Sequence, residues 1–151
     1  MTVRLPRKLA RLDRSPVYLV HRTQQLATEI FNRELAVLDL TRPQFTLLMT
    51  ISLHPKLSQK QISARTGIDQ STLGQMAARL EQRGLLQRAR RPGSPRGLML
   101  ALTRKGTTLL EKAKTLAANA DRNLLHTVPP AERRIVMNAL TAWSDLLDEP
   151  R

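Results

Sequence analysis

SQKQISARTGIDQSTLGQMAARLEQRGLL, residues 58–86, is the stretch that decides the fold of this chain. Ser58 is a good helix start, and Gln61 three residues later completes a capping box with it. Gly67 is a good helix stop, because glycine adopts the left-handed conformation that ends helices. The first half of the stretch therefore predicts a short helix that ends in a tight turn.

A second short helix follows the turn, with Asp69 or Ser71 as its N-cap. Leu73, Ala77 and Leu80 recur at helical spacing and form one apolar stripe. The opposite face is polar and basic: Thr72, Gln75, Arg79 and Gln82 or Arg83. Two helices joined by a glycine turn make a helix-turn-helix, in which the second helix enters the DNA major groove. By itself the pair fits a solvated helical hairpin equally well.

A basic β-hairpin decides between these two interpretations. Residues 85–91 have the composition of a strand, 92–97 contain two prolines and two glycines, and 98–102 are an apolar second strand. A hairpin directly after the second helix predicts a winged helix-turn-helix.

The positive charge is concentrated in this region. The chain has a net charge of +13, and residues 58–106 hold ten Lys/Arg against two Asp/Glu. Residues 107–151 are balanced, with six of each, and residues 15–57 nearly so. The basic tail, residues 1–14, is a disordered arm, a loosely docked segment, or a second contact to DNA or to a partner subunit, and we expect it to be partly disordered. A basic block between near-neutral flanks indicates a phosphate-binding surface.

The rest of the chain predicts helices. One begins at Ser15-Pro16 and continues to near Leu38, the next begins at Thr41 and ends at His54, and two more lie on either side of Pro129-Pro130. The fold class is thus mainly α with a small β-hairpin wing. The expected division is a tail (1–14), dimerisation helices (15–40 and 104–149) and a DNA-binding winged helix (41–103). The terminal helices either cap a monomeric core or pair with a second copy, and their apolar area favours a homodimer.

Other function classes fit poorly. The chain has no cysteine, and His21, His54 and His126 lack the close spacing of metal ligands, so we expect no metal and no cofactor. Twelve acids and no glycine-rich phosphate loop argue against an enzyme. One Trp, one Tyr and two Phe argue against RNA binding by base stacking. No apolar run approaches the roughly 18 residues of a membrane span, so we expect a cytoplasmic protein.

The chain resembles the MarR family of bacterial transcriptional regulators over nearly its whole length. The stretches that carry the resemblance are LTRPQFTLLMTI (40–51), LSQKQISARTGIDQSTLGQMAARLEQRGLLQR (57–88) and LMLALTRKG (98–106). The resemblance implies a homodimer with interlocking terminal helices, pseudo-palindromic operators in double-stranded DNA, and repression that small aromatic or phenolic anions often relieve. It also implies association with the bacterial nucleoid while bound. The alternative is a basic architectural DNA-binding protein without an effector.

The candidate DNA contacts lie on the second helix and on the hairpin. In the helix they are Gln70, Ser71, Thr72, Gln75 and Arg79, and in the hairpin Arg88, Arg90, Arg91, Ser94 and Arg96. Gln75 can pair with adenine, and Arg79 contacts either guanine or phosphate. Arg96 matches the wing arginine of the family, but Ser94 replaces its acidic partner. Gly74 is a second departure from expectation, because glycine inside a helix costs about 1 kcal/mol relative to alanine.

A polar cluster on the first long helix is a candidate effector site. Tyr18, His21, Arg22 and Gln25 lie within two turns, and we expect them to face Phe45 and Met49 of the next helix. A cation, a hydroxyl and an imidazole suit an anionic head group, and apolar neighbours suit an aromatic ring. The predicted ligand is a small aromatic carboxylate, a phenol or an acyl thioester. The alternative is a hydrogen-bond network within a subunit interface.

Overall fold

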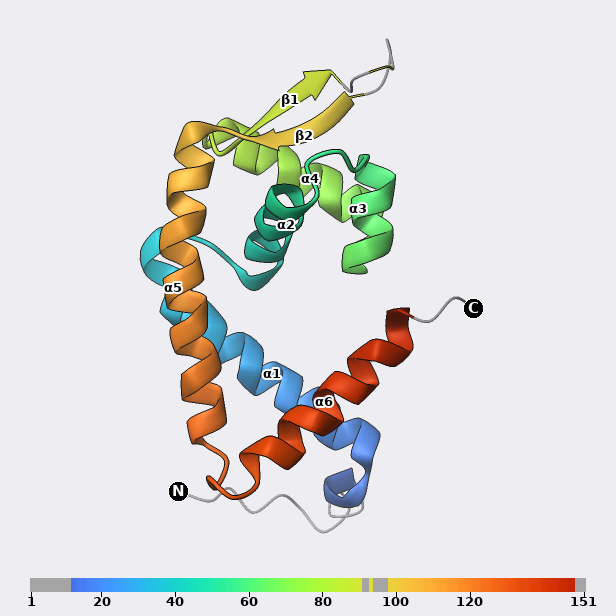
Figure 1. Ribbon diagram of the computed structural model, residues 1–151, viewed down its shortest axis with the longest axis vertical. Coiled ribbons are helices and arrows are strands. Elements are labelled where there is room, and N and C mark those ends of the chain that lie inside the picture. Colours follow the sequence, from blue (N-terminus) through green and yellow to red (C-terminus); the bar gives the residue numbers. More distant parts are fainter. Residues whose placement is uncertain (1–11, 91–92, 94–97, 149–151) are drawn as a thin grey trace.

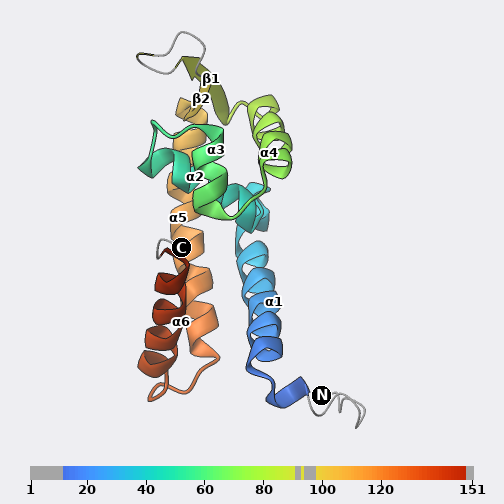
Figure 2. The same cartoon turned by 90° about the vertical axis from the view of Figure 1, so that its right-hand side faces the viewer.

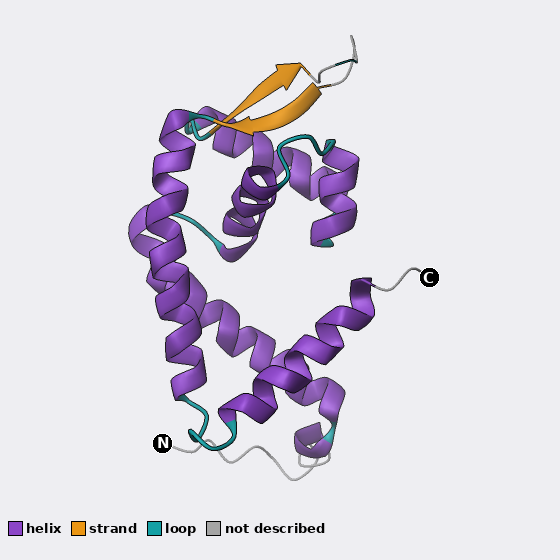
Figure 3. Ribbon diagram, in the orientation of Figure 1, coloured by secondary structure: helices purple, strands orange, loops and turns teal. Residues whose placement is uncertain are grey.

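The computed structural model describes residues 12–90, 93 and 98–148 of the 151-residue chain. Most of this part is helical, with one two-stranded antiparallel sheet (Figure 3). The helices are η1 (Leu12–Arg14), α1 (Pro16–Leu35), η2 (Ala36–Leu38), α2 (Arg42–Leu53), α3 (Gln59–Thr66), α4 (Gln70–Gln82), α5 (Arg104–His126) and α6 (Arg133–Asp148), and the strands are β1 (Leu86–Arg90) and β2 (Leu98–Leu102). The mainly α fold with a small hairpin is confirmed.

The molecule has two ends joined by α5. Helices α2, α3 and α4 and the hairpin lie together at one end, and α6 and most of α1 lie at the other (Figure 1). Seen from the side, the hairpin lies above α2 and α3, and α4 lies beside them (Figure 2). Helix α5 begins beside the hairpin and packs along α1. It therefore belongs to both ends of the molecule.

The predicted helix boundaries at the helix-turn-helix are confirmed by capping contacts. Ser58 N donates to Gln61 Oε1 at 2.9 Å, and Gln61 N donates to Ser58 Oγ at 3.3 Å. Gly67 ends α3 in the left-handed conformation, with φ of 70°. Of the two N-caps proposed for α4, Asp69 is the one used, since its carboxylate accepts from Thr72 N. Ser71 lies inside the helix and is exposed, so capping by Ser71 is wrong.

The first long helix is shorter than the sequence suggested. Helix α1 ends at Leu35, and residues 36–38 tighten into the 3-10 turn η2. Asp39 then adopts the left-handed conformation, with φ of 50°, and its N–H donates to Ala36 O at 2.9 Å. Leu35 is completely buried, so the helix ends where the chain enters the core. Periodicity alone could not show this, because the 3-10 turn continues the same apolar pattern.

The core lies at the winged-helix end. Its fully buried side chains are Leu35, Leu47, Leu48, Ile51, Ile62, Leu73, Leu80, Leu85, Leu100 and Leu110. They come from α1 to α5, from β2 and from the residue before β1, so α5 and the end of α1 close this core. The large apolar side chains of α6 are by contrast exposed. No helix in the described part of the chain is long and apolar enough to cross a membrane.

The hairpin pairs in the expected order. Leu86 faces Leu102, and Arg90 faces Leu98, in an antiparallel register. Leu85 precedes the strand and accepts from Thr103 N at 3.1 Å, which ties the start of β1 to the start of α5. Arg91 and the tip residues 94–97 lie outside the described residues.

Candidate DNA interface and effector cavity

Helix α4 presents a polar face while its other side is fixed in the core. Leu73 and Leu80 are completely buried. The five side chains predicted to contact DNA from this helix, Gln70, Ser71, Thr72, Gln75 and Arg79, are all exposed. Amide, hydroxyl and guanidinium groups are the donors and acceptors that base edges and phosphates require. The helix is thus rigidly held with its hydrogen-bonding groups outward.

The N-terminus of α4 has a negatively charged cap. Asp69 Oδ1 accepts from Thr72 N at 2.9 Å. Hydrogen bonds from Thr72, through its side chain and then its backbone, lower the pKa of Asp69 below its ordinary value of 3.8. A carboxylate at a helix N-terminus is also favoured by the helix dipole. The start of the helix is therefore fixed without using Ser71, which stays available to a partner.

The two described arginines of β1 differ in their surroundings. Arg88 Nε donates to both carboxylate oxygens of Glu81 in α4, at 3.1 and 3.3 Å. Arg90 is exposed. The pair holds β1 against the end of α4, so Arg88 has a structural partner in the free protein. The other proposed wing contacts, Arg91, Ser94 and Arg96, lie outside the described residues.

A joint at the end of α4 connects it to α1 and α5. Arg83 NH1 donates to Asp39 O at 2.6 Å, and NH2 donates to Leu38 O at 3.1 Å. Lys105 Nζ of α5 donates to Arg83 O at 2.8 Å. The sequence pattern places Gln82 or Arg83 on the polar face of α4. In the structure the guanidinium of Arg83 instead points to the turn that follows α1. The end of α4 is thus hydrogen-bonded to the turn that follows α1 and to the first turn of α5.

Close packing also fixes this joint. Thr103 Oγ1 donates to Gly84 O at 2.6 Å. A Cβ at Gly106 would lie 2.0 Å from Leu85 O, so only glycine permits this approach of α5 to the turn before β1. Gly106 could not be singled out from the sequence, because its role depends on a contact between distant segments.

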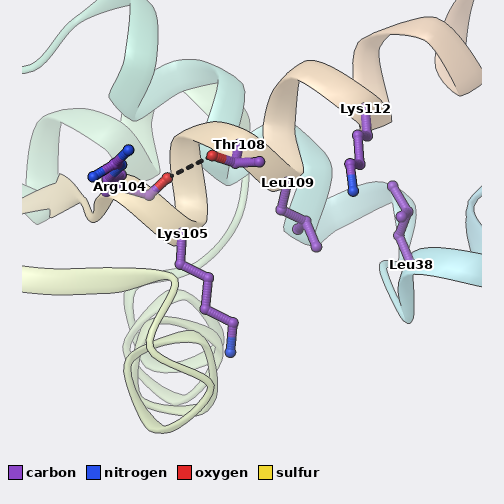
Figure 4. A pocket seen from close by; sticks show the side chains of 6 residues that line it. All are labelled: Leu38, Arg104, Lys105, Thr108, Leu109 and Lys112. Atoms are coloured by element: carbon purple, nitrogen blue, oxygen red, sulfur yellow. Dashed lines mark hydrogen bonds between the residues drawn. The ribbon is translucent and has the colours of Figure 1, made fainter.

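A positively charged cavity of about 560 Å³ adjoins the joint. It is lined by Leu38, Arg104, Lys105, Thr108, Leu109 and Lys112. Lys112 extends from α5 toward Leu38 of η2, and Thr108 Oγ1 donates to Arg104 O (Figure 4). None of these six residues is acidic, so the cavity extends the basic surface along the first turns of α5.

The proposed effector residues do not form one site within a protomer. Arg22 NH1 donates to Gln25 Oε1 at 3.4 Å, and Gln25 Nε2 lies 3.2 Å from His21 Nε2. This polar cluster is largely exposed, with Tyr18 half-buried.

The side of α1 that carries Phe31 faces away from this polar cluster. Phe31 is nine residues after Arg22, about two and a half turns, and so lies on the opposite side of α1. The rings of Phe31 and Phe45 are 5.3 Å apart. Met49 packs against the core. The predicted meeting of the cluster with Phe45 and Met49 does not occur in one protomer.

Two cavities flank α1 on that other side. The first, about 260 Å³, lies between α1, α2 and α5 and is lined by Ala27, Phe31, Arg42, Phe45, Thr46, Ala120, Asp121 and Leu124. The second, about 510 Å³ and almost wholly apolar, lies between α1 and α6, with Trp143 and Leu140 in its wall. The first combines the rings of Phe31 and Phe45 with one cation and one carboxylate, and sequence analysis did not bring these groups together because they come from three separate helices.

Comparison with known proteins identifies the family. A model described as "MarR family" matches residues 38–97. The organic hydroperoxide resistance transcriptional regulator of Bacillus subtilis is 30% identical over 103 residues, which cover 68% of this chain and 70% of that protein. The chain belongs to the MarR family. As a member it is a DNA-binding transcriptional regulator and not an enzyme, as the sequence indicated.

Solved structures of MarR proteins share the fold. The transcriptional repressor CouR, bound to a 23-mer DNA duplex, is 29% identical with a TM-score of 0.83, covering 93% of this chain and 99% of that one. BpsR of Bordetella bronchiseptica, whose DNA binding is regulated by 6-hydroxynicotinic acid, is 27% identical with a TM-score of 0.78, covering 87% and 94%. Both matches cover most of this MarR-family chain.

Proposed function

We propose that this chain is a ligand-responsive repressor that binds a pseudo-palindromic operator as a homodimer. The observation that carries the proposal is the polar, exposed face of α4, fixed on a filled core in the most basic part of the chain. In a helix-turn-helix this face lies in the major groove. Acting on the chromosome would place the protein in the bacterial cytoplasm, associated with the nucleoid while bound.

The apolar surface of the terminal helices supports the homodimer. Trp143 is 51% exposed and Leu147 78% exposed on α6, and Val17 is 82% exposed on α1. Further exposed apolar side chains on the same helices are Leu19, Val20, Leu26, Ile135, Met137, Leu140 and Leu146. An exposed apolar surface of this extent is typical of a subunit interface. Residues 15–40 and 104–149 are accordingly proposed as the dimerisation helices and 41–103 as the DNA-binding unit.

Within the DNA-binding unit we assign Gln75 and Arg79 to base contacts, and Gln70, Ser71 and Thr72 to the phosphates near the start of α4. Arg90, Arg91 and Arg96 neutralise phosphates or enter the minor groove from the hairpin. Arg88 joins them if DNA displaces Glu81 from it. Two helices related by a two-fold axis contact half-sites about one turn of DNA apart, 10–10.5 bp, or a multiple of it.

Selection of bound fragments from random duplexes tests the proposal. We expect an inverted repeat, and sedimentation should show a dimer at micromolar concentration. Gln75→Ala should cost about 1–3 kcal/mol on the selected site and relax the preference at particular base pairs. Asn138→Ala is the control: it removes an exposed amide from α6, outside the proposed DNA-binding unit, and should leave the consensus unchanged. A selected site without symmetry, or a monomer, would refute this model.

The effector we propose is a small aromatic carboxylate, a phenol or an acyl thioester. The support within the protomer is the cavity beside Phe31 and Phe45, where Arg42 supplies a positive charge. This cavity lies where α1 and α5 meet α2, between the two ends of the molecule. The cluster of Tyr18, His21, Arg22 and Gln25 contributes only if a second protomer brings it to a ligand.

Two variants locate the site. A panel of aromatic acids and their thioesters is screened by thermal shift and by release of DNA, on wild type, Arg42→Ala and Arg22→Ala. Loss of ligand affinity in Arg42→Ala alone assigns the cavity, and loss in Arg22→Ala alone assigns the cluster. A ligand that prefers the non-binding spacing of the two α4 helices should weaken DNA binding roughly 5–150-fold. If no ligand acts, the alternative of an architectural DNA-binding protein is favoured.

A further inference from the structure

Gly74 is a glycine that the protomer itself does not require. It is an interior residue of α4, and it is not among the described glycines with positive φ, Gly67, Gly84 and Gly93. A Cβ built at Gly74 would meet nothing within 4 Å. Gly106 is the opposite case, because a Cβ there would collide with Leu85 O. Neither backbone conformation nor packing inside the protomer explains Gly74.

Glycine is also a poor choice for the stability of α4. It is one of the least favourable residues in a helix interior, since it loses the most backbone entropy on folding. Alanine would fit in the space at position 74 and strengthen the helix. The absence of a side chain therefore points to something outside the protomer.

The position of Gly74 on α4 shows which surface is concerned. Glu81 is seven residues further along, about two helical turns, so the two residues share one edge of the helix. Glu81 is hydrogen-bonded to Arg88 of β1, which identifies this edge as the one on the hairpin side. Gln75 is adjacent on the exposed face. Gly74 thus lies between the DNA-contacting face of α4 and the hairpin, which are at the same end of the molecule (Figures 1 and 2).

We propose that Gly74 is a DNA-contact position, where the sugar-phosphate backbone packs directly against the main chain of α4. The inference rests on the proposed function. With α4 in the major groove and the hairpin at the adjacent minor groove, the strand that separates the grooves passes between them. A side chain at position 74 would hold that strand away from the helix. The contact depends on shape and involves no charge.

The test compares Gly74→Ala and Gly74→Val with wild type. Binding to the selected duplex and to a scrambled duplex is measured by fluorescence anisotropy at several salt concentrations, and stability by thermal melting. Gly74→Ala should raise the melting temperature by about 2–4 °C. It should weaken binding to both duplexes by roughly 5–150-fold, as steric overlap in a packed contact does. Gly74→Val should bind more weakly still.

The salt dependence separates a steric effect from an electrostatic one. Because no charge is removed, the slope of log affinity against log salt should be the same as in wild type. Thr115→Ala is the control: it replaces an exposed poorer helix former in α5 by alanine. It should raise stability without weakening DNA binding.

A raised melting temperature with unchanged DNA affinity in Gly74→Ala would overturn the inference, and so would a reduced salt slope, which indicates displaced cations. Failure of wild type to prefer any duplex is a different result. It refutes the proposed function and is seen without any variant.

Discussion

The winged helix and the terminal helices leave opposite kinds of surface uncovered. In the winged helix Leu73 is completely buried, while in α6 Trp143 is 51% exposed. Residues 58–106 carry ten Lys/Arg against two Asp/Glu, while residues 107–151 carry six of each. The winged helix has a buried core and an excess of positive charge, so its surface suits an anionic partner. The terminal helices have balanced charge and uncovered apolar area, so their partner is another apolar surface.

The largest change in stability is expected for a substitution in the buried core of the winged helix. Leu73→Ala removes a completely buried side chain that anchors α4, and should lower the free energy of unfolding by about 2–5 kcal/mol. Urea titration measures it. If the loss is below about 1 kcal/mol, burial of Leu73 does not anchor α4 in the core.

Trp143→Ala tests the other region. Losing a half-buried indole at an interface should cost about 1–2 kcal/mol per subunit and raise the monomer–dimer dissociation constant roughly tenfold or more. Sedimentation equilibrium measures this constant. Leu53→Ala is the control, because Leu53 is 64% exposed in α2, outside the proposed dimerisation helices 15–40 and 104–149, and should leave the constant unchanged. If both variants raise the dissociation constant equally, dimerisation does not depend specifically on the apolar surface of the terminal helices.

Arg83→Gln tests the connection between the regions. It removes the hydrogen bonds that the guanidinium donates to Leu38 O and Asp39 O, and should cost about 1–2 kcal/mol of stability. Arg33→Gln is the control, since the Arg33–Glu29 pair is on the surface and should contribute at most about 0.5 kcal/mol. Thermal melting compares them. Identical melting temperatures would show that the joint adds nothing to stability.

The smallest effect concerns the cap of α4. The pKa of Asp69 is lowered in the folded protein by the bonds from Thr72. Asp69 therefore stabilises the fold above its unfolded pKa, and this contribution is lost as the pH falls through the folded value. As the pH decreases from about 5 to 3, the melting temperature should decrease less steeply for Asp69→Asn than for wild type. A steeper fall in the variant would contradict the cap assignment.

Local patterns predicted the elements well. Capping residues such as Ser58 and stop signals such as Gly67 act on their immediate neighbours, so they can be recognised without tertiary contacts. The order of helices and hairpin, and hence the family, followed from them. The same reasoning left Asp69 and Ser71 open as caps of α4, because both are good caps and only the backbone geometry separates them.

The sequence by itself determined the order and type of the elements, the location of the charge and the polar face of α4, because periodicity, capping and composition are local properties. The tertiary structure decided what depends on distant segments meeting. It turned Arg83 from the DNA face to the end of α1, paired Arg88 with Glu81, and set Phe45 against Phe31 instead of the cluster around Arg22. It also separated two glycines that look alike in sequence. Gly106 is required by the approach of Leu85, whereas Gly74 has open space beside it.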